Sequence, residues 1–303
     1  MKASFTQPLF ILASPRSFTS LTCGMLGQHP EAYGVAELSL FTSDTLQEFM
    51  DKMQGIFQYN IHGLLRVVMQ LYAGEQTLNS LEMARRWILA RYHCTTGEVY
   101  QEICQKVAPK QIIDKSPIYS TKREIMNRIY QSFPDAYFLY LVRHPRTQGQ
   151  SMMNFAQGDL AIFSNSIDYS KSPPIVDPQY WWYTMQRNIL DFLEVVPSEQ
   201  KMFLRGEDLL GDPVRYFEKI CRWLNLSWND AALESMLNPQ KSPYACFGPY
   251  GAHAGNDPNF MKSAKFKQRT IQPSHLSGSL PWRSDNQGLI PDVIQLARNL
   301  GYE

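Results

Sequence analysis

The chain has 303 residues, 44% of them hydrophobic, and a formal net charge of +1 at pH 7. Its length allows a large buried core, and so small a charge excludes long-range attraction to nucleic acid or to an anionic membrane surface. No apolar run is long enough to cross a bilayer, and residues 8–13 are too short for the core of a signal peptide. The five scattered cysteines contain no C-x-x-C pair. We therefore predict a cytoplasmic protein with reduced thiols and no metal site.

Short apolar runs alternate with amphipathic segments along the chain. Four runs are typical of buried parallel strands, at residues 9–13, 111–113, 137–142 and 202–204. Helices are expected at residues 18–28, 118–132, 143–155, 179–195 and 213–224. This alternation predicts an α/β fold with a doubly wound parallel sheet of about four or five strands, flanked by helices.

Two long segments interrupt that alternation. Residues 42–111 are expected to form a helical insertion, with an apolar face that includes Leu64, Val67, Val68 and Leu71. Residues 239–288 are rich in Gly, Pro, Ser and Asn, and a long irregular stretch in a compact domain is often functional. We interpret residues 239–288 as a C-terminal lid, and residues 1–303 as one domain.

The strongest functional signals follow two of the predicted strands. The first strand leads into Ser14-Pro15-Arg16-Ser17-Phe18-Thr19-Ser20; the strand that ends at Val142 leads into Arg143-His144-Pro145, with Ser151 eight residues after Arg143. At the carboxyl end of a parallel strand, the next helix directs free N–H groups and its positive dipole end into the crevice, which suits an anion. Two such places, each with an arginine, predict one ligand with phosphates at two ends.

The P-loop of nucleotide kinases is absent. That motif, G-x-x-x-x-G-K-[ST], uses glycines and a lysine to surround phosphates. Here no glycine lies between Leu12 and Cys23, and no lysine follows. A nucleotide kinase is therefore disfavoured.

The motifs resemble those of the sulfotransferases that use 3′-phosphoadenosine 5′-phosphosulfate (PAPS). Segment 14–20 is similar to their 5′-phosphosulfate loop, and Arg143, Ser151 and Phe155 resemble their 3′-phosphate site. Similar blocks occur at 26–37, 113–117 and 205–213. The likeness is greatest to tyrosylprotein sulfotransferases and to bacterial sulfotransferases of natural-product and polyketide pathways. It implies PAPS as donor, 3′-phosphoadenosine 5′-phosphate (PAP) as product, and no metal.

The resemblance also implies roles for particular residues. Donor-binding residues would be Arg16, Ser17, Phe18, Thr19, Ser20, Arg143, Ser151, Ser263, Trp282 and Arg283. Lys115, in an Asp-Lys-x-Pro setting, would reach the sulfonate and the leaving oxygen together with Arg16. Sulfuryl transfer resembles phosphoryl transfer, so such cations would stabilise charge that develops in the transition state.

Three residues are candidates for the general base. Glu37 lies twenty-one residues after Arg16, the spacing of the catalytic glutamate in the tyrosylprotein branch; alternatively it is a carboxylate at a helix N-terminus. His253 and His275 in the lid are rival candidates, because the bacterial branch often has a base-like histidine there. A strict alignment places Ser263 at that position.

The chain departs from the family pattern at two positions. Phe18 stands where the family's loop has a glycine, and Gly206 stands where its strand usually has an aromatic residue before Glu-Asp-Leu. Either the loop has ordinary helical φ at Phe18, or a side chain there is strained and donor binding differs.

The expected acceptor is a hydroxyl of a small-molecule natural product, covered by the insertion and the lid. A second candidate is a β-hydroxyacyl chain on an acyl carrier protein. An alternative of another class is a non-catalytic nucleotide-binding protein. No nucleic-acid or membrane partner is expected.

Overall fold

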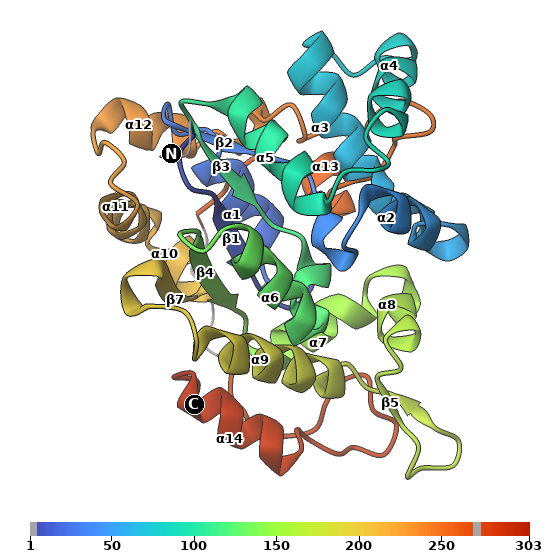
Figure 1. The fold of residues 1–303 in the computed structure, drawn as a ribbon. Coiled ribbons are helices and arrows are strands. Elements are labelled where there is room, and N and C mark those ends of the chain that lie inside the picture. The colour runs from blue at the N-terminus through green and yellow to red at the C-terminus, as the bar shows by residue number, and fades with distance from the viewer. Residues whose placement is uncertain (1–4, 269–273) are drawn as a thin grey trace.

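A five-stranded parallel sheet forms the centre of the computed structural model, which describes residues 5–268 and 274–303 (Figure 1). The strand order is β2-β3-β1-β4-β7. The strands are β1 (Leu9–Leu12), β2 (Ala32–Gly34), β3 (Gln111–Asp114), β4 (Tyr137–Val142) and β7 (Lys201–Arg205). This arrangement confirms the α/β fold with a parallel sheet of four or five strands.

Both faces of the sheet are covered by helices, which explains the uninterrupted apolar runs in the central strands. Along β1, Phe10 and Leu12 belong to one core and Leu9 and Ile11 to the other, because successive side chains of a strand point to opposite faces. The first core includes helices α5 (Thr96–Val107), α6 (Arg123–Ser132) and α9 (Gln179–Leu193). The second includes α1 (Thr19–Leu26) and α11 (Pro213–Trp223).

The predicted insertion is helical. Between β2 and β3 the chain forms α2 (Leu46–Lys52), α3 (Ile61–Ala73), α4 (Leu78–Leu89) and α5. Thr45, Thr77 and Thr95 each cap the helix that follows, by accepting a backbone N–H bond. Figure 1 shows α3 and α4 packed together beyond one end of the sheet.

The lid has little regular structure. Its one α-helix among the described residues is α13 (Pro258–Lys262), and residues 269–273 lie outside the described part of the chain. Arg66 of α3 is fully buried and donates to the lid carbonyls of Cys246, at 2.8 Å, and Ala254, at 3.1 Å. The lid is thereby attached to the insertion.

The prediction was incomplete in three places. Strand β2 was not foreseen, because a three-residue Ala-Tyr-Gly segment has no periodic pattern; its pairing with β3 creates it. Between the helices predicted at residues 143–155 and 179–195, where no element was expected, the chain forms α8 (Asp159–Phe163) and the hairpin of β5 (Ile167–Asp168) and β6 (Ile175–Val176). The helix predicted at residues 143–155 is α7 (Pro145–Met153).

Three further α-helices lie in the described part of the chain: α10 (Gly206–Gly211), α12 (Asp230–Met236) and α14 (Pro291–Asn299), of which α14 packs outside α9. Within residues 5–268 and 274–303, no helix combines the length and the apolar character needed to cross a membrane.

Helix α3 meets the segment after β2 at Gly63. A Cβ atom added there would lie 1.8 Å from the backbone oxygen of Glu37. Only glycine allows this approach, and the contact brings the insertion against the backbone of the predicted base.

The substitution Gly63→Ala should therefore lower the free energy of unfolding by about 1–3 kcal/mol, the usual cost of overpacking. Gly211→Ala is the matched control, because an added Cβ there meets no atom within 4 Å; its stability should be unchanged or slightly higher. Urea denaturation of both variants measures the difference. Equal stabilities would show that the contact can relax without cost.

Candidate active site

Each strand of the sheet delivers one functional position to the same edge. In spatial order across the sheet these positions are Glu37 after β2, Lys115 after β3, Arg16 after β1, Arg143 after β4 and Gly206 after β7. Because the strands are parallel, their carboxyl ends share that edge, the usual place for a ligand in open α/β sheets.

The loop between β1 and α1 is held in an unusual backbone conformation. Arg16 and Phe18 both adopt left-handed geometry, with φ of 65° and 64°, at a cost of about 1–2 kcal/mol for each residue. Phe18 therefore does not have ordinary helical φ. The carbonyl oxygens of Pro15 and Arg16 accept hydrogen bonds from Gln148 (2.8 Å) and Arg143 (2.7 Å). These bonds stabilise the strained turn.

This turn leaves the start of α1 open. No side chain caps the helix at Phe18, and its first turn contains no acidic residue. The unpaired backbone N–H groups and the helix dipole therefore favour an anion. Ser17, Thr19 and Ser20 surround this end, and the Ser17 hydroxyl lies 3.0 Å from that of Ser14.

Arg16 connects three parts of the site. Its Nε donates to the hydroxyl of Ser151 on α7 at 3.2 Å, and its guanidinium lies 5.1 Å from the ring centre of Phe155. It also forms an ion pair with Asp257. Asp257 caps α13 of the lid, so this ion pair attaches the lid to the loop between β1 and α1. The role of Asp257 was not predicted from the sequence.

Arg143 lies on the other side of the loop. Its Nε donates to Thr147 at 3.1 Å, and burial lowers its pKa to about 10, so it stays charged at neutral pH. The N-terminus of α7 is not free, contrary to prediction: His144 caps it by accepting from the N–H of Arg146 at 3.2 Å. An anion at this end depends on side chains such as Arg143 and Ser151.

Arg16, Arg143 and Ser151 line one cavity of about 560 Å³ between α7 and α13, a size typical of small-molecule sites. Lys262, Asn259, Gln150 and Asn154 also line it and were missed. Gln150 and Asn154 could have been found, because both are near Ser151 on the same predicted helix. Lys262 reaches the cavity only because the lid folds over it.

The two residues predicted for proton transfer and charge stabilisation are in contact. Lys115 is 1% exposed and its ammonium forms an ion pair with the carboxylate of Glu37, whose side chain is 27% exposed. Next to them, burial raises the pKa of Asp114 to about 7, although Tyr119 and Ser116 donate hydrogen bonds to it at 3.0 and 3.1 Å. A buried lysine with one carboxylate partner is poised to bind an anion that displaces that partner.

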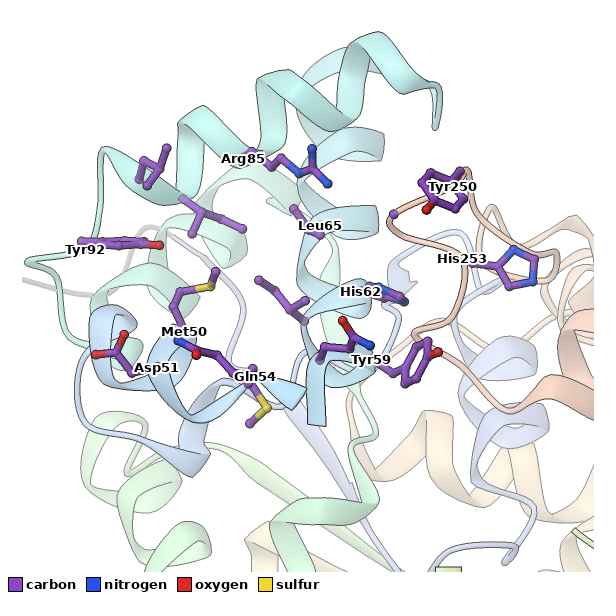
Figure 2. A pocket seen from close by; sticks show the side chains of 16 residues that line it. Met50, Asp51, Gln54, Tyr59, His62, Leu65, Arg85, Tyr92, Tyr250 and His253 are labelled. Atoms are coloured by element: carbon purple, nitrogen blue, oxygen red, sulfur yellow. The ribbon is translucent and has the colours of Figure 1, made fainter. Parts of the chain in front are cut away.

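A second, larger cavity of about 1040 Å³ lies between the insertion and the lid (Figure 2). Apolar side chains from three helical segments dominate its lining, namely Met50, Met53, Ile61, Leu65, Ile88 and Leu89. Figure 2 shows Tyr250 and His253 on the lid segment beside His62 of α3, with the His253 ring turned away from His62. His62 precedes Gly63, which touches the backbone oxygen of Glu37, so this side of the groove is near the Glu37 backbone; Glu37 and Lys115 themselves do not line the cavity.

Hydrogen bonds define the tautomers of the two groove histidines. Nδ1 of His62 accepts the N–H of Ala254 at 3.1 Å, so in the neutral ring Nε2 carries the proton. Burial lowers the pKa of His62 and keeps the ring neutral. Nδ1 of His253 faces the carbonyl oxygen of Gly248 at 3.3 Å and must donate to it, which leaves Nε2 as a proton acceptor. His253 therefore remains a rival base; His62 is a donor.

Three other predicted positions lie apart from this pair. His275 is exposed and lies near His144, whose pKa is lowered to about 4 chiefly by burial, with smaller contributions from Arg146, Arg143 and His275; this position does not support a base role. Ser263 is the exposed C-cap of α13, one residue after Lys262. Trp282 packs on Gly149 of α7, where an added Cβ would lie 2.5 Å from the indole.

Arg283 lies in an ion-pair cluster, and a donor-binding role for it stays a prediction. Its side chain is 3% exposed and forms ion pairs with Asp168, Asp177 and Asp285. These carboxylates compensate its charge and accept hydrogen bonds from Nε, Nη1 and Nη2, so they compete with any phosphate for the guanidinium. Arg283 joins the β5–β6 hairpin to the lid.

Residues 5–268 and 274–303 contain no group of three or more His, Cys, Asp or Glu side chains arranged to hold a metal ion.

The sequence matches the sulfotransferase family model over residues 8–230, and the chain belongs to that family. A sulfotransferase domain from the curacin biosynthetic pathway has the same fold, with a TM-score of 0.76, 24% identity and 98% coverage of each chain. The sulfotransferase domain of the Synechococcus PCC 7002 olefin synthase gives a TM-score of 0.72 and 26% identity, over 100% of this chain and 98% of that one. No curated protein sequence matches this chain.

The buried carboxyl of Asp114 should make stability depend on pH. Its pKa is about 7 when folded, against an ordinary value of 3.8, so between these values the folded state holds a proton that the unfolded state releases. The contribution of Asp114 to the free energy of unfolding should therefore fall as the pH rises from about 4 through 7. Asp114→Asn cannot titrate, so urea denaturation at pH 5 and pH 8 should show wild type losing stability relative to this variant. A pH-independent difference would contradict the raised pKa.

Proposed function

We propose that this protein is a PAPS-dependent sulfotransferase that transfers a sulfuryl group to a hydroxyl and releases PAP. The observation that carries the proposal is the line of positions along one sheet edge: Glu37, Lys115, Arg16 with the open start of α1, and Arg143. Two anion-binding places on neighbouring strand ends, beyond β1 and β4, suit one donor with phosphates at both ends.

The donor would bind across the loop that follows β1. The open N–H groups of α1 and Arg16 suit the 5′-phosphosulfate. Arg143 and Ser151 suit the 3′-phosphate, since both line the cavity beside α7. Lys262 adds a third cation to that cavity.

The Lys115–Glu37 pair suits the transfer step. The acceptor oxygen attacks sulfur as the bond from sulfur to the 5′-phosphate oxygen breaks, and the electron pair leaves with the phosphate. Lys115 and Arg16 would stabilise this departing charge. A sulfonate that takes the Lys115 ammonium frees the Glu37 carboxylate to accept the hydroxyl proton. The ion pair thus keeps both groups at the reaction centre before substrates arrive.

The acceptor would lie in the groove between the insertion and the lid. Its apolar lining suits the apolar part of a small natural product. The lining residue His62 is followed by Gly63, which touches the Glu37 backbone, so the acceptor hydroxyl would be directed toward Glu37. The Nε2–H of His62 is placed to donate to an oxygen of that acceptor.

A β-hydroxyacyl chain on an acyl carrier protein is the second acceptor candidate. Two observations favour it: the groove is large, about 1040 Å³, with a mainly apolar lining, and the two similar solved structures are sulfotransferase domains of a biosynthetic pathway and of an olefin synthase. Turnover of a free hydroxy compound against the same group on a carrier protein separates the candidates.

The donor assignment predicts selectivity for the 3′-phosphate. Wild type should bind PAP far more tightly than AMP, and Arg143→Ala should lose most of that preference, because a hydrogen bond to a charged group contributes about 1.5–3 kcal/mol. Isothermal titration with PAP, AMP and ATP provides the measurement. Arg146→Ala is a matched control, because that arginine donates to the carbonyls of Ser277, Gly278 and Ser279. Equal affinity of the wild-type protein for PAP and AMP would contradict the donor assignment.

Measurements of turnover and of donor affinity should distinguish the role of Glu37 from that of Lys115. Glu37→Gln and Lys115→Ala should each reduce turnover by roughly 10²–10⁴-fold. Glu37→Gln should keep or raise donor affinity, because it removes a carboxylate near a polyanion, whereas Lys115→Ala should weaken it. Donor titration and single-turnover rates, with His253→Ala and His275→Ala alongside, test this. Near-normal turnover of Glu37→Gln beside an inactive His253→Ala would assign the base to the lid.

A further inference from the structure

The two positions that depart from the family pattern are in direct contact. A Cβ atom added to Gly206 would lie 2.6 Å from Cδ2 of the Phe18 ring, closer than non-bonded carbon atoms approach. Gly206 does not adopt a positive φ, so the requirement for glycine is space and not backbone freedom. The ring of Phe18 occupies the volume that a side chain at position 206 would fill.

The Phe18 ring also supports the arginine assigned to the 3′-phosphate. The guanidinium of Arg143 lies over it, 4.3 Å from the ring centre. On its edges, Nε donates to Thr147 and Nη1 to the carbonyl oxygen of Arg16. Within the described residues Nη2 has no hydrogen-bond partner, and Arg143 lines the cavity beside α7. One face and two nitrogens of the Arg143 guanidinium are thus held by the protein, and its Nη2 is left for a ligand.

We propose that Phe18 is a positioning residue for 3′-phosphate recognition, and that Gly206 is the complementary residue that makes room for it. This inference rests on the proposed donor. A planar guanidinium stacks on an aromatic face, and a group fixed before binding loses less conformational freedom when the ligand arrives. The strained φ of Phe18 is retained because the ring has this task.

The two departures from the family pattern are therefore linked by one exchange: the aromatic ring stands at position 18 in place of position 206. An aromatic ring supplied from position 206 and one supplied from position 18 would overlap, so the chain can hold only one of them. Phe18 also packs on the core that contains Leu9 and Ile11 of β1 and residues of α11, which anchors the ring.

The decisive measurement is the ratio of PAP to AMP affinity, by isothermal titration of the full chain. Phe18→Leu keeps a β-carbon and apolar bulk but removes the aromatic face, and should lower the ratio about 3- to 30-fold, the range of a cation–π contact. AMP affinity should change little. Phe18→Tyr should retain the wild-type ratio. Phe203→Leu is the matched control, because this aromatic residue of β7 packs on Tyr140 and not on Arg143.

The exchange itself is tested by a double-mutant cycle. Gly206→Phe should lose both stability and the preference for PAP, because its ring overlaps Phe18. Phe18→Gly combined with Gly206→Phe should recover part of both. Thermal unfolding of every variant separates lost folding from lost recognition. If Gly206→Phe does not fold, the Phe18→Leu and Phe18→Tyr variants still test the positioning role.

Three outcomes overturn the inference. An unchanged ratio in Phe18→Leu removes the positioning role and leaves the donor assignment intact. An equal loss in Phe203→Leu assigns the effect to general destabilisation. A double variant no better than a folded Gly206→Phe refutes the exchange. If wild type does not distinguish PAP from AMP, the donor assignment and the inference fail together.

Discussion

The parallel direction of five strands governs everything at this site. Residues as distant in sequence as Glu37 and Gly206 lie along the same edge of the sheet because every strand ends there. The strand order then sets the order of functions: a carboxylate and a lysine beyond β2 and β3, the anion loop at the centre, and a second arginine beyond β4. A change in strand order would separate these groups even if every local motif were kept.

Cations at that edge are held by partners that a substrate can replace. Lys115 pairs with Glu37, Arg16 pairs with Asp257 of the lid, and Arg143 donates to a loop carbonyl. Buried charges need such partners, because desolvation without compensation is costly. The Arg16–Asp257 pair also connects the sheet to the lid, so under the proposed function a donor that displaced Asp257 from Arg16 would release that attachment.

The lid is fixed to the insertion by a different kind of contact. Arg66 is completely buried and donates to Gln76 and to several backbone carbonyls of the lid, while burial lowers its pKa. Neutral acceptors satisfy its hydrogen bonds without creating a second charge. This arginine therefore holds the lid against α3, and residues of both segments line the groove. The groove is therefore a product of packing between two segments far apart in the chain.

The sequence by itself determined the class of fold, the strand ends and the residues that carry charge, because apolar periodicity and short motifs are local properties. Arg16, Lys115, Arg143 and Ser151 were identified in this way. Tertiary structure alone decided which of them touch. It brought Asp257 to Arg16 and Lys262 to the cavity beside α7, surrounded Arg283 with three carboxylates, and placed Phe18 against Gly206. Each of these contacts joins segments that no local pattern relates, and their partners are defined only when the sheet, the insertion and the lid have packed together.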